Sequence, residues 1–555
     1  MKLLRAFLFI LLLTFSLTLL SCRSTAQTIA RDLRLNLGLE PATLDPALAS
    51  DPGAKQIARM LFLSLVDTDA ATAAPQPALA QSWAVSADGL IWEFKLRPDA
   101  MWVRYAPATE RFEQKRAVTA QDVVYSVRRV FDPRVNSSFA PVFAPLLRGA
   151  EQLRGADIQK TSATDFEKLF AALGVQALDD FTVRFTLTRA ASYFPSIASA
   201  WLVRVVPREV IDAGGSAWTE PGAVWTNGPF VLERWTHNRE IILKKNPLWY
   251  AADSVRIDRI RFAMFADTAT ALDQYQQGNL DSLDPYGGLT PTDFEQLRED
   301  PFLSKQMQIT PTLCTHYYGF NTTKPPFNDA RVRKAFSAAI DRETIVSASV
   351  KLGEPARWFT PPGVFASVEK SDALGIAFNV NQAREFLRQA GYDKKKLPQI
   401  TVGVSTNDTH ERIAESLVQM WKTNLNAEVS VKTTDWKNYL QNLRDDPPQI
   451  FRLGWCAYFP DAANFSESVF RSGSLENFTR WNNPQFYRLV DSAAHESDVA
   501  RRRAQYRAAE KMLTEEFAVI LPLWWTNRAT LTKPNVQRSF AIIEGYERIE
   551  TWNLQ

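Results

Sequence analysis

The sequence predicts an α/β fold that is divided into several domains. Segments that alternate between apolar and polar residues, as half-buried strands do, follow segments with helical spacing along the whole chain. Removing a predicted leader of 21 residues from the 555 residues leaves 534, which is more than one hydrophobic core usually supports. We therefore expect two to four domains, although no internal repeat and no low-complexity linker marks their boundaries.

In the first half of the chain, Leu33, Leu35 and Leu37 indicate a strand that ends in a proline-containing turn. The same alternation predicts further strands over residues 90–103, 181–188, 240–250 and 256–265. Helical spacing predicts helices over residues 55–66, 119–133 and 268–281. In the second of these helices Thr119 is the expected N-cap, and the helix has to end before Pro133.

The second half of the chain continues the alternation. Predicted helices cover residues 329–346, 381–392, 409–425 and 501–517. Predicted strands cover residues 399–405, 428–434 and 518–525. Asp329 is expected to begin the first of these helices, and Gly391 to end the second, because these residue types favour helix starts and helix ends.

The N-terminus has the features of a secretory signal peptide over residues 1–21. Lys2 and Arg5 precede an apolar run that is shorter than the roughly 20 residues needed to span a bilayer. The residues around Cys22, LLSC, resemble a bacterial lipobox, in which the cysteine is lipidated and becomes the first residue after cleavage. The alternative is ordinary cleavage, with Cys22 incidental. We expect residues 22–30 to form a lipidated tether and no other segment to cross a membrane.

Cys314 and Cys456 are the two remaining cysteines. In an oxidising compartment disulfides persist, so one bridge is the default prediction. The alternative is a catalytic thiolate at Cys456, which would need a nearby base. No histidine lies close to Cys456 in the sequence, although one can lie close in space.

Composition narrows the range of functions. With 46% apolar residues, 23% charged residues and a net charge of +3, the chain shows no case for binding nucleic acid. The four histidines have no metal-ligand spacing, and no motif for a nucleotide, a serine nucleophile or a zinc protease occurs. We therefore expect no metal and no cofactor, and an enzyme is disfavoured. The sixteen tryptophans suit a pocket that accepts varied side chains.

Eight motifs together resemble the extracytoplasmic peptide-binding proteins of ABC importers, family 5 of the solute-binding proteins. They lie in the family's order at residues 39–46, 77–102, 119–133, 218–235, 313–345, 359–363, 383–392 and 452–456. The resemblance implies a two-lobed periplasmic-binding-protein fold (type II, Venus flytrap) with a small inserted domain, three domains in all. Lobe I would comprise residues 28–72, 190–311 and 525–555, the inserted domain residues 73–189, and lobe II residues 312–524.

The same resemblance implies a set of ligand-binding residues. Cys314 and Cys456 fall where oligopeptide-binding members carry a disulfide, at the edge of the binding cleft. His410 and Arg452 match residues that contact the peptide carboxylate. The alternatives are that His410 is a surface residue at the start of a helix and that Arg452 forms a structural ion pair. Arg444 lies one residue from another such arginine, and Phe139 matches an aromatic residue that packs over the ligand. Gly454, Trp455 and Cys456 match the strand that pairs with the peptide backbone, where glycine permits close approach.

One position departs from the family pattern. Members carry an aspartate that holds the peptide α-amino group where this chain has Tyr458. A buried ammonium group without a carboxylate costs several kcal/mol. Either Asp461 or another acid takes the role, or the ligand has no free amine there and is a modified peptide, a cell-wall fragment or an unrelated solute. An early acidic residue of the family's cleft aligns near Ser50 and Asp51.

The sequence thus predicts extracytoplasmic binding of oligopeptides, or peptide-like solutes, and their delivery to the permease subunits of an ABC importer, through which the ATPase acts. We expect a monomer in the periplasm or at the cell surface, held to the membrane by its lipid alone, with no nucleic-acid partner. The alternatives are an exported peptidase or cell-wall hydrolase, and a peptide-sensing lipoprotein that feeds no transporter.

Overall fold

The computed structural model describes residues 31–70, 72, 74–138, 140–200, 203–283, 289, 291–369, 372–393, 395–540 and 547–555. The predicted signal peptide, the predicted lipidation site Cys22 and the candidate ligand contact Phe139 lie outside these residues. Within the described part of the chain, none of the helices combines the length and the apolar character that a membrane span requires.

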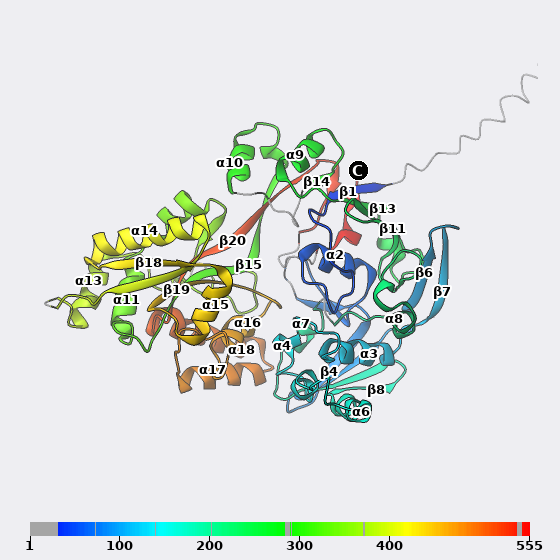
Figure 1. Cartoon of the computed structure of the whole chain (residues 1–555), viewed down its shortest axis with the longest axis horizontal. Coiled ribbons are helices and arrows are strands. Elements are labelled where there is room, and N and C mark those ends of the chain that lie inside the picture. The colour runs from blue at the N-terminus through cyan, green and yellow to red at the C-terminus, as the bar shows by residue number, and fades with distance from the viewer. Residues whose placement is uncertain are drawn as a thin grey trace, which may run out of the picture.

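A mixed sheet of eleven strands runs through the molecule (Figure 1). Its main path is β11 (Phe230–Thr236), β12 (Glu240–Lys245), β13 (Arg259–Ala263), β1 (Asp32–Asn36), β14 (Ser282–Leu283), β20 (Ile520–Thr532), β15 (Met307–Phe320), β19 (Ile450–Cys456), β17 (Ile400–Ser405) and β18 (Val429–Thr434). β16 (Gly353–Pro355) pairs with β20 outside this path. Neighbouring strands therefore come from distant parts of the chain.

In the half of the sheet around β1, the first predicted strand is confirmed. Leu33 and Leu35 are buried, and β1 runs parallel to β13 and β14. Helix α2 (Pro52–Leu61) follows, capped by Asp51, whose carboxylate accepts a hydrogen bond from the Ala54 N–H at 2.7 Å. Helix α9 (Thr268–Gln276) also lies in this part of the chain.

Between β2 (Val66–Thr68) and α7 (Phe194–Ile197) the chain builds a separate four-stranded sheet. Its order is β4 (Ala80–Val85), β5 (Ile91–Leu96), β9 (Thr182–Thr186) and β8 (Val175–Asp179). Helix α3 (Ala120–Phe131) contacts β8 and β9, as its amphipathic pattern predicts. The strand predicted over 90–103 is two strands, β5 and β6 (Met101–Ala106), because Pro98 and Asp99 form a turn between them.

The other half of the large sheet packs against α11 (Ala330–Ala338), α13 (Val380–Gln389) and α14 (Asp408–Leu425). In its core Phe336 contacts Trp421, with ring centroids 5.2 Å apart. The single helix predicted over 329–346 is interrupted after α11. Asp341 begins a new helix, α12 (Arg342–Ile345), because its side chain accepts a hydrogen bond from the Thr344 N–H at 3.2 Å.

The long strands β15 and β20 connect the two halves of the sheet (Figure 1). The first part of β15 pairs with β20 near β14, and its last part pairs with β20 beside β19. The pairing register is interrupted between Pro311 and Thr315. We refer to this pair of strands as the strand crossing.

A second connection lies between residues 189–194 and three later helices, α16 (Ala463–Phe470), α17 (Pro484–His495) and α18 (Val499–Lys511). The Glu467 carboxylate is buried and accepts hydrogen bonds from Arg189 (2.5 Å), the Tyr193 hydroxyl (3.1 Å) and the Tyr506 hydroxyl (2.9 Å). The Ser192 N–H donates to the Ala494 carbonyl. We call this group of four side chains the Glu467 junction. In Figure 1 the helices α7, α16 and α18 lie below the strand crossing.

Candidate binding site along strand β19

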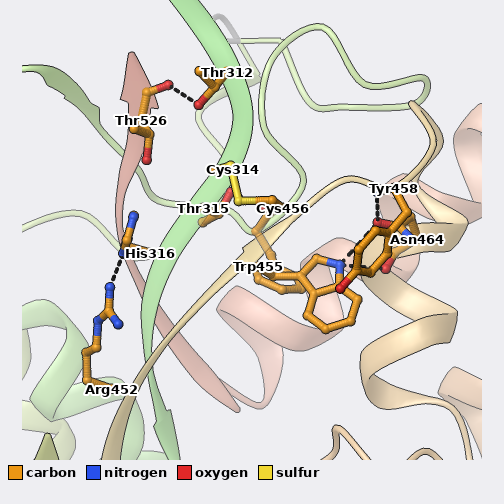
Figure 2. Close-up of a disulfide and its surroundings, with 11 residues drawn as sticks. Thr312, Cys314, Thr315, His316, Arg452, Trp455, Cys456, Tyr458, Asn464 and Thr526 are labelled. Atoms are coloured by element: carbon orange, nitrogen blue, oxygen red, sulfur yellow. Dashed lines mark hydrogen bonds between the residues drawn. A yellow bond between two sulfur atoms is a disulfide. The ribbon is translucent and has the colours of Figure 1, made fainter. Parts of the chain in front are cut away.

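The disulfide predicted between Cys314 and Cys456 is confirmed. The two residues lie opposite each other in the antiparallel pair β15–β19, with Cα atoms 4.0 Å apart, and their sulfur atoms are bonded (Figure 2). The bond therefore fixes the end of β19 to β15. It also excludes Cys456 as a free nucleophile in this state.

Among the strands of the described residues, the last residues of β19 have a partner on one side only. β17 pairs with β19 at Ile450 and Phe451 and no further. The Arg452 N–H donates to the Tyr439 hydroxyl at 3.0 Å, which directs this peptide group away from β15. Because these directions alternate along a strand, the peptide groups of Gly454 and Cys456 face the same open edge. Both residues are exposed, so an extended peptide can add to this edge as a further strand.

Arg452 is buried beside this edge, with 6% of its surface exposed. Its Nη2 donates to Nδ1 of His316 at 2.5 Å, and its Nε has no hydrogen-bond partner in the described part of the chain. No carboxylate of the described residues forms an ion pair with it, and burial lowers the pKa of its guanidinium. A buried cation without a counter-ion is costly, so this site favours an anion from outside.

His410 lies in the first turn of α14 and is half-buried. Its Nδ1 is 3.3 Å from the Ser405 hydroxyl oxygen. Burial, and then the charge of Arg452, lower the pKa of His410 to about 4. The structure therefore places His410 in the electrostatic field of Arg452, and neither residue forms an ion pair within the described residues.

His316 belongs to this cluster, although the sequence analysis did not single it out. It lies opposite Gly454 in the β15–β19 pair, and its ring stacks on Trp524 with centroids 4.2 Å apart. A Cβ atom at position 454 would lie 3.2 Å from His316 Nδ1, so glycine leaves room for the imidazole. The sequence did contain a signal for His316. If Cys314 and Cys456 lie opposite each other in two antiparallel strands, the residues two positions further along, His316 and Gly454, must also lie opposite each other.

Trp455 and Tyr458 form an aromatic pair after the disulfide (Figure 2). Their ring centroids are 5.7 Å apart, and the rings are nearly perpendicular. Asn464 holds both residues, since its carbonyl oxygen accepts from the Trp455 indole N–H at 2.9 Å and its side chain accepts from the Tyr458 N–H at 3.1 Å. Burial raises the pKa of Tyr458. Its phenol is therefore neutral at physiological pH.

Asp461 is engaged inside the protein. It is 4% exposed and forms an ion pair with Arg502 at 2.6 Å. Its carboxylate also accepts from the Ala463 N–H at 3.0 Å. These bonds argue against Asp461 as the holder of a ligand amine, because a ligand would have to compete with a buried arginine.

Arg444 lies in the last turn of α15 (Trp436–Asp445) and is exposed. Its carbonyl oxygen accepts a hydrogen bond from Arg480. No hydrogen bond or ion pair joins it to Arg452, His316 or His410 within the described residues. In the same part of the chain no group of three or more His, Cys, Asp or Glu residues could hold a metal ion.

Within the described residues, an open strand edge therefore lies beside a buried cation that has no carboxylate partner, an arrangement suited to a solute that offers a main chain and an acidic end. Residues 74–477 match the family described as bacterial extracellular solute-binding proteins, family 5. The chain belongs to this family, whose members are binding proteins rather than enzymes.

Two relatives and one pair of structures illustrate the similarity. The chain is 30% identical to the Escherichia coli periplasmic oligopeptide-binding protein OppA over 512 residues, covering 92% of this chain and 89% of OppA. It is 31% identical to the E. coli probable deoxycholate-binding periplasmic protein YgiS over 508 residues, covering 91% and 89%. The unliganded open form of the murein tripeptide-binding protein MppA superposes with a TM-score of 0.82 at 27% identity, covering 95% and 98%.

A second structure of MppA from E. coli superposes with a TM-score of only 0.67, although the sequence identity is again 27%. The chain therefore superposes better on the unliganded open form, and its fold is the two-lobed fold of the family.

Proposed function

We propose that the protein binds oligopeptides, or peptide-like solutes, outside the cytoplasm and delivers them to the permease subunits of an ABC importer. The observation that carries this proposal is the open edge of β19 at Gly454 and Cys456, which ends beside the unpaired cation Arg452. Main-chain pairing binds a peptide without reading its sequence. The names of OppA and MppA, a binder of oligopeptides and a binder of murein peptide, are consistent with this ligand class.

In this proposal the ligand pairs with the peptide groups of Gly454 and Cys456, and its carboxylate contacts Arg452 and His410. Trp455 and Tyr458 contact the other end of the ligand, and Phe139 covers it from the inserted domain. Arg444 would meet only a longer ligand, because it lies outside the Arg452 cluster. The two lobes close around the ligand if the ligand makes more favourable contacts in the closed state than in the open state.

The proposed domain division keeps the boundaries of the sequence analysis, with lobe I at 28–72, 190–311 and 525–555, the inserted domain at 73–189 and lobe II at 312–524. The interruption of the β15–β20 register between Pro311 and Thr315 supports the division near residue 311. We further propose that the protein is a monomer that is anchored to the membrane through a lipid on Cys22.

Mass spectrometry of the ligand that co-purifies with the protein tests the function. We expect one or more short peptides, released on denaturation, in a stoichiometric native complex. A protein that carries no peptide, binds none in calorimetry and hydrolyses peptides or cell-wall fragments would contradict the proposal and favour an exported enzyme.

A second candidate ligand is an acidic solute without an amine. Tyr458 stands where the family has its amine-binding aspartate, and Asp461 is already paired with Arg502. The carboxylate of such a solute would still reach Arg452. The name of YgiS, a probable deoxycholate-binding protein, shows that a relative with 31% identity is assigned a ligand of this kind.

The variant Tyr458→Asp discriminates between the two candidates. It introduces a carboxylate beside Trp455, where a peptide amine would lie, and an amine–carboxylate contact in a partly buried site is worth about 1.5–3 kcal/mol. We expect binding of a tripeptide with a free amine to tighten by roughly tenfold to a hundredfold in calorimetry. The N-acetylated tripeptide is the control, which should gain nothing. Equal gains for the two peptides, or no gain, would contradict our account of this position.

A further inference from the structure

His316 determines the orientation of the Arg452 guanidinium. The two side chains come from neighbouring strands, and the bond between Nη2 and Nδ1 is 2.5 Å long (Figure 2). Stacking on Trp524 fixes the plane of the imidazole, and Gly454 leaves the space that the ring occupies. The position of His316 is therefore set by packing, and Arg452 takes its orientation from it.

The protonation state of His316 follows from this bond. A guanidinium has only donors, so Nδ1 of His316 must be the acceptor. The ring is therefore neutral and carries its proton on Nε2. Adding a second proton at Nδ1 would remove the acceptor and release the Arg452 N–H from this bond.

The surroundings of His316 oppose that second proton in the empty site. The charged and titratable groups that act on it are Arg452 on β19 and His410 on α14. Arg452 in turn interacts with the tyrosines Tyr317 and Tyr318 on β15 and Tyr439 on α15. The contact from β20 is Trp524, which does not titrate. Burial, and then the charges of Arg452 and His410, lower the pKa of His316 well below its usual range. Among these neighbours there is no carboxylate to offset a second positive charge.

A ligand carboxylate supplies the missing negative charge. We propose that His316 is a positioning residue that couples capture of a ligand carboxylate at Arg452 to the uptake of one proton from solvent. The proton binds Nδ1 of His316, the bond between Nδ1 and Arg452 breaks, and the released Arg452 N–H donates to the ligand carboxylate. No other bond changes. This inference rests on the proposed function, because it assumes a ligand with a free carboxylate.

The sign of the pH dependence follows from linkage. The bound protein holds more protons than the free protein, so affinity rises as pH falls. A terminal carboxyl has a pKa of about 3.3–3.7 and stays ionised above pH ~5. Each unit by which the ligand raises the pKa of His316 allows up to about tenfold in affinity. We expect the dissociation constant to fall roughly tenfold between about pH 7.5 and about pH 5.

Calorimetry of tri-alanine and of its C-terminal amide over this pH range provides the test. Both peptides carry the same amine, so the difference between them isolates the carboxylate. For the acid we expect tighter binding at low pH and a heat that depends on the ionisation enthalpy of the buffer. For the amide we expect neither effect.

Three variants assign the proton. His316→Gln keeps an acceptor for Arg452 but cannot take up a proton, so the pH dependence should disappear. His316→Phe also removes the acceptor, so its Arg452 N–H is released at every pH and the pH dependence should again disappear. The exposed His495, whose ring bonds to the Asp491 carbonyl, is the matched control, and His495→Gln should keep the wild-type profile.

The outcomes are distinguishable. If His316→Gln keeps the pH dependence, or if His410→Gln alone removes it, the proton does not go to His316 and the inference is wrong. If the wild-type protein binds tri-alanine with no pH dependence, the inference is wrong while the proposed function stands. If the wild-type protein binds neither peptide at any pH, the proposed function fails, and this inference fails with it.

Discussion

Replacing Arg452 by methionine is expected to weaken binding of a peptide with a free carboxylate by about 2–5 kcal/mol, which is roughly thirtyfold to several thousandfold. The same change is expected to leave the ligand-free protein as stable as the wild type, or more stable. In the free protein the guanidinium is buried and has no carboxylate partner among the residues that the structure describes, so a methionine of similar length removes a desolvation cost. Calorimetry for binding and denaturant unfolding for stability measure the two effects separately.

Arg333 is the matched control for this prediction. It is also buried in the same part of the molecule, but its guanidinium donates to the carbonyl oxygens of Phe517 (2.9 Å) and Phe327 (2.6 Å). Arg333→Met therefore removes the donor from one buried and one partly buried carbonyl, and we expect a loss of stability. If Arg452→Met also destabilises the protein and leaves peptide affinity unchanged, then Arg452 is a structural residue and not a ligand contact.

Replacing Glu467 by alanine is expected to lower the free energy of unfolding by about 3–5 kcal/mol. The change leaves Arg189 with its charge and the hydroxyls of Tyr193 and Tyr506 without their acceptor, in a place where the Glu467 side chain is 2% exposed. Scanning calorimetry and urea unfolding would measure the loss. Glu467→Gln, which keeps an acceptor but removes the charge, should fall between alanine and the wild type.

An exposed ion pair serves as the control for this second prediction. Glu385 pairs with Arg388 at 2.6 Å on the surface of α13, where the Glu385 side chain is 44% exposed. Exposed pairs contribute about 0–1 kcal/mol, so Glu385→Ala should have little effect on stability. A Glu467→Ala variant that loses no more stability than Glu385→Ala would show that the Glu467 junction is not a stabilising contact.

Local signals were sufficient to predict many individual elements. Helix α3 begins after Thr119, whose N–H donates to the Asp122 carboxylate at 2.9 Å, and it ends before Pro133. Such caps act within a few residues, so they can be recognised in the sequence. Two predicted elements are divided where a short polar feature interrupts a longer pattern, at the turn of Pro98 and Asp99 and at the cap Asp341. The helix predicted over 55–66 ends earlier, at Leu61, and strand β2 begins at Val66.

The binding site was less predictable, because its chemistry depends on contacts between distant residues. Family resemblance indicated the disulfide and the candidate role of Arg452. It did not indicate that Arg452 would have no carboxylate partner among the described residues, because an ion pair depends on which distant residues the fold brings together. Asp461 shows the opposite case, because its partner Arg502 lies 41 residues away on helix α18. The contact between His316 and Arg452 can be recognised only once the pairing of strands β15 and β19 is known, because that pairing places His316 opposite Gly454.

The presence of two separate connections has a mechanical consequence. A body joined to another at one point can turn about any axis through that point, but a body joined at two points can turn only about the line between them. The strand crossing and the Glu467 junction are two such points, and in Figure 1 the helices α16 and α18, which carry Glu467 and Tyr506, lie below the crossing. While both connections hold, the only rotation open to the lobes is about that line, so the lobe closure that we propose would follow a single path. A ligand then has to fix the lobes only along this one rotation. Fixing lobes that could rotate about several axes would cost more entropy and so lower the affinity.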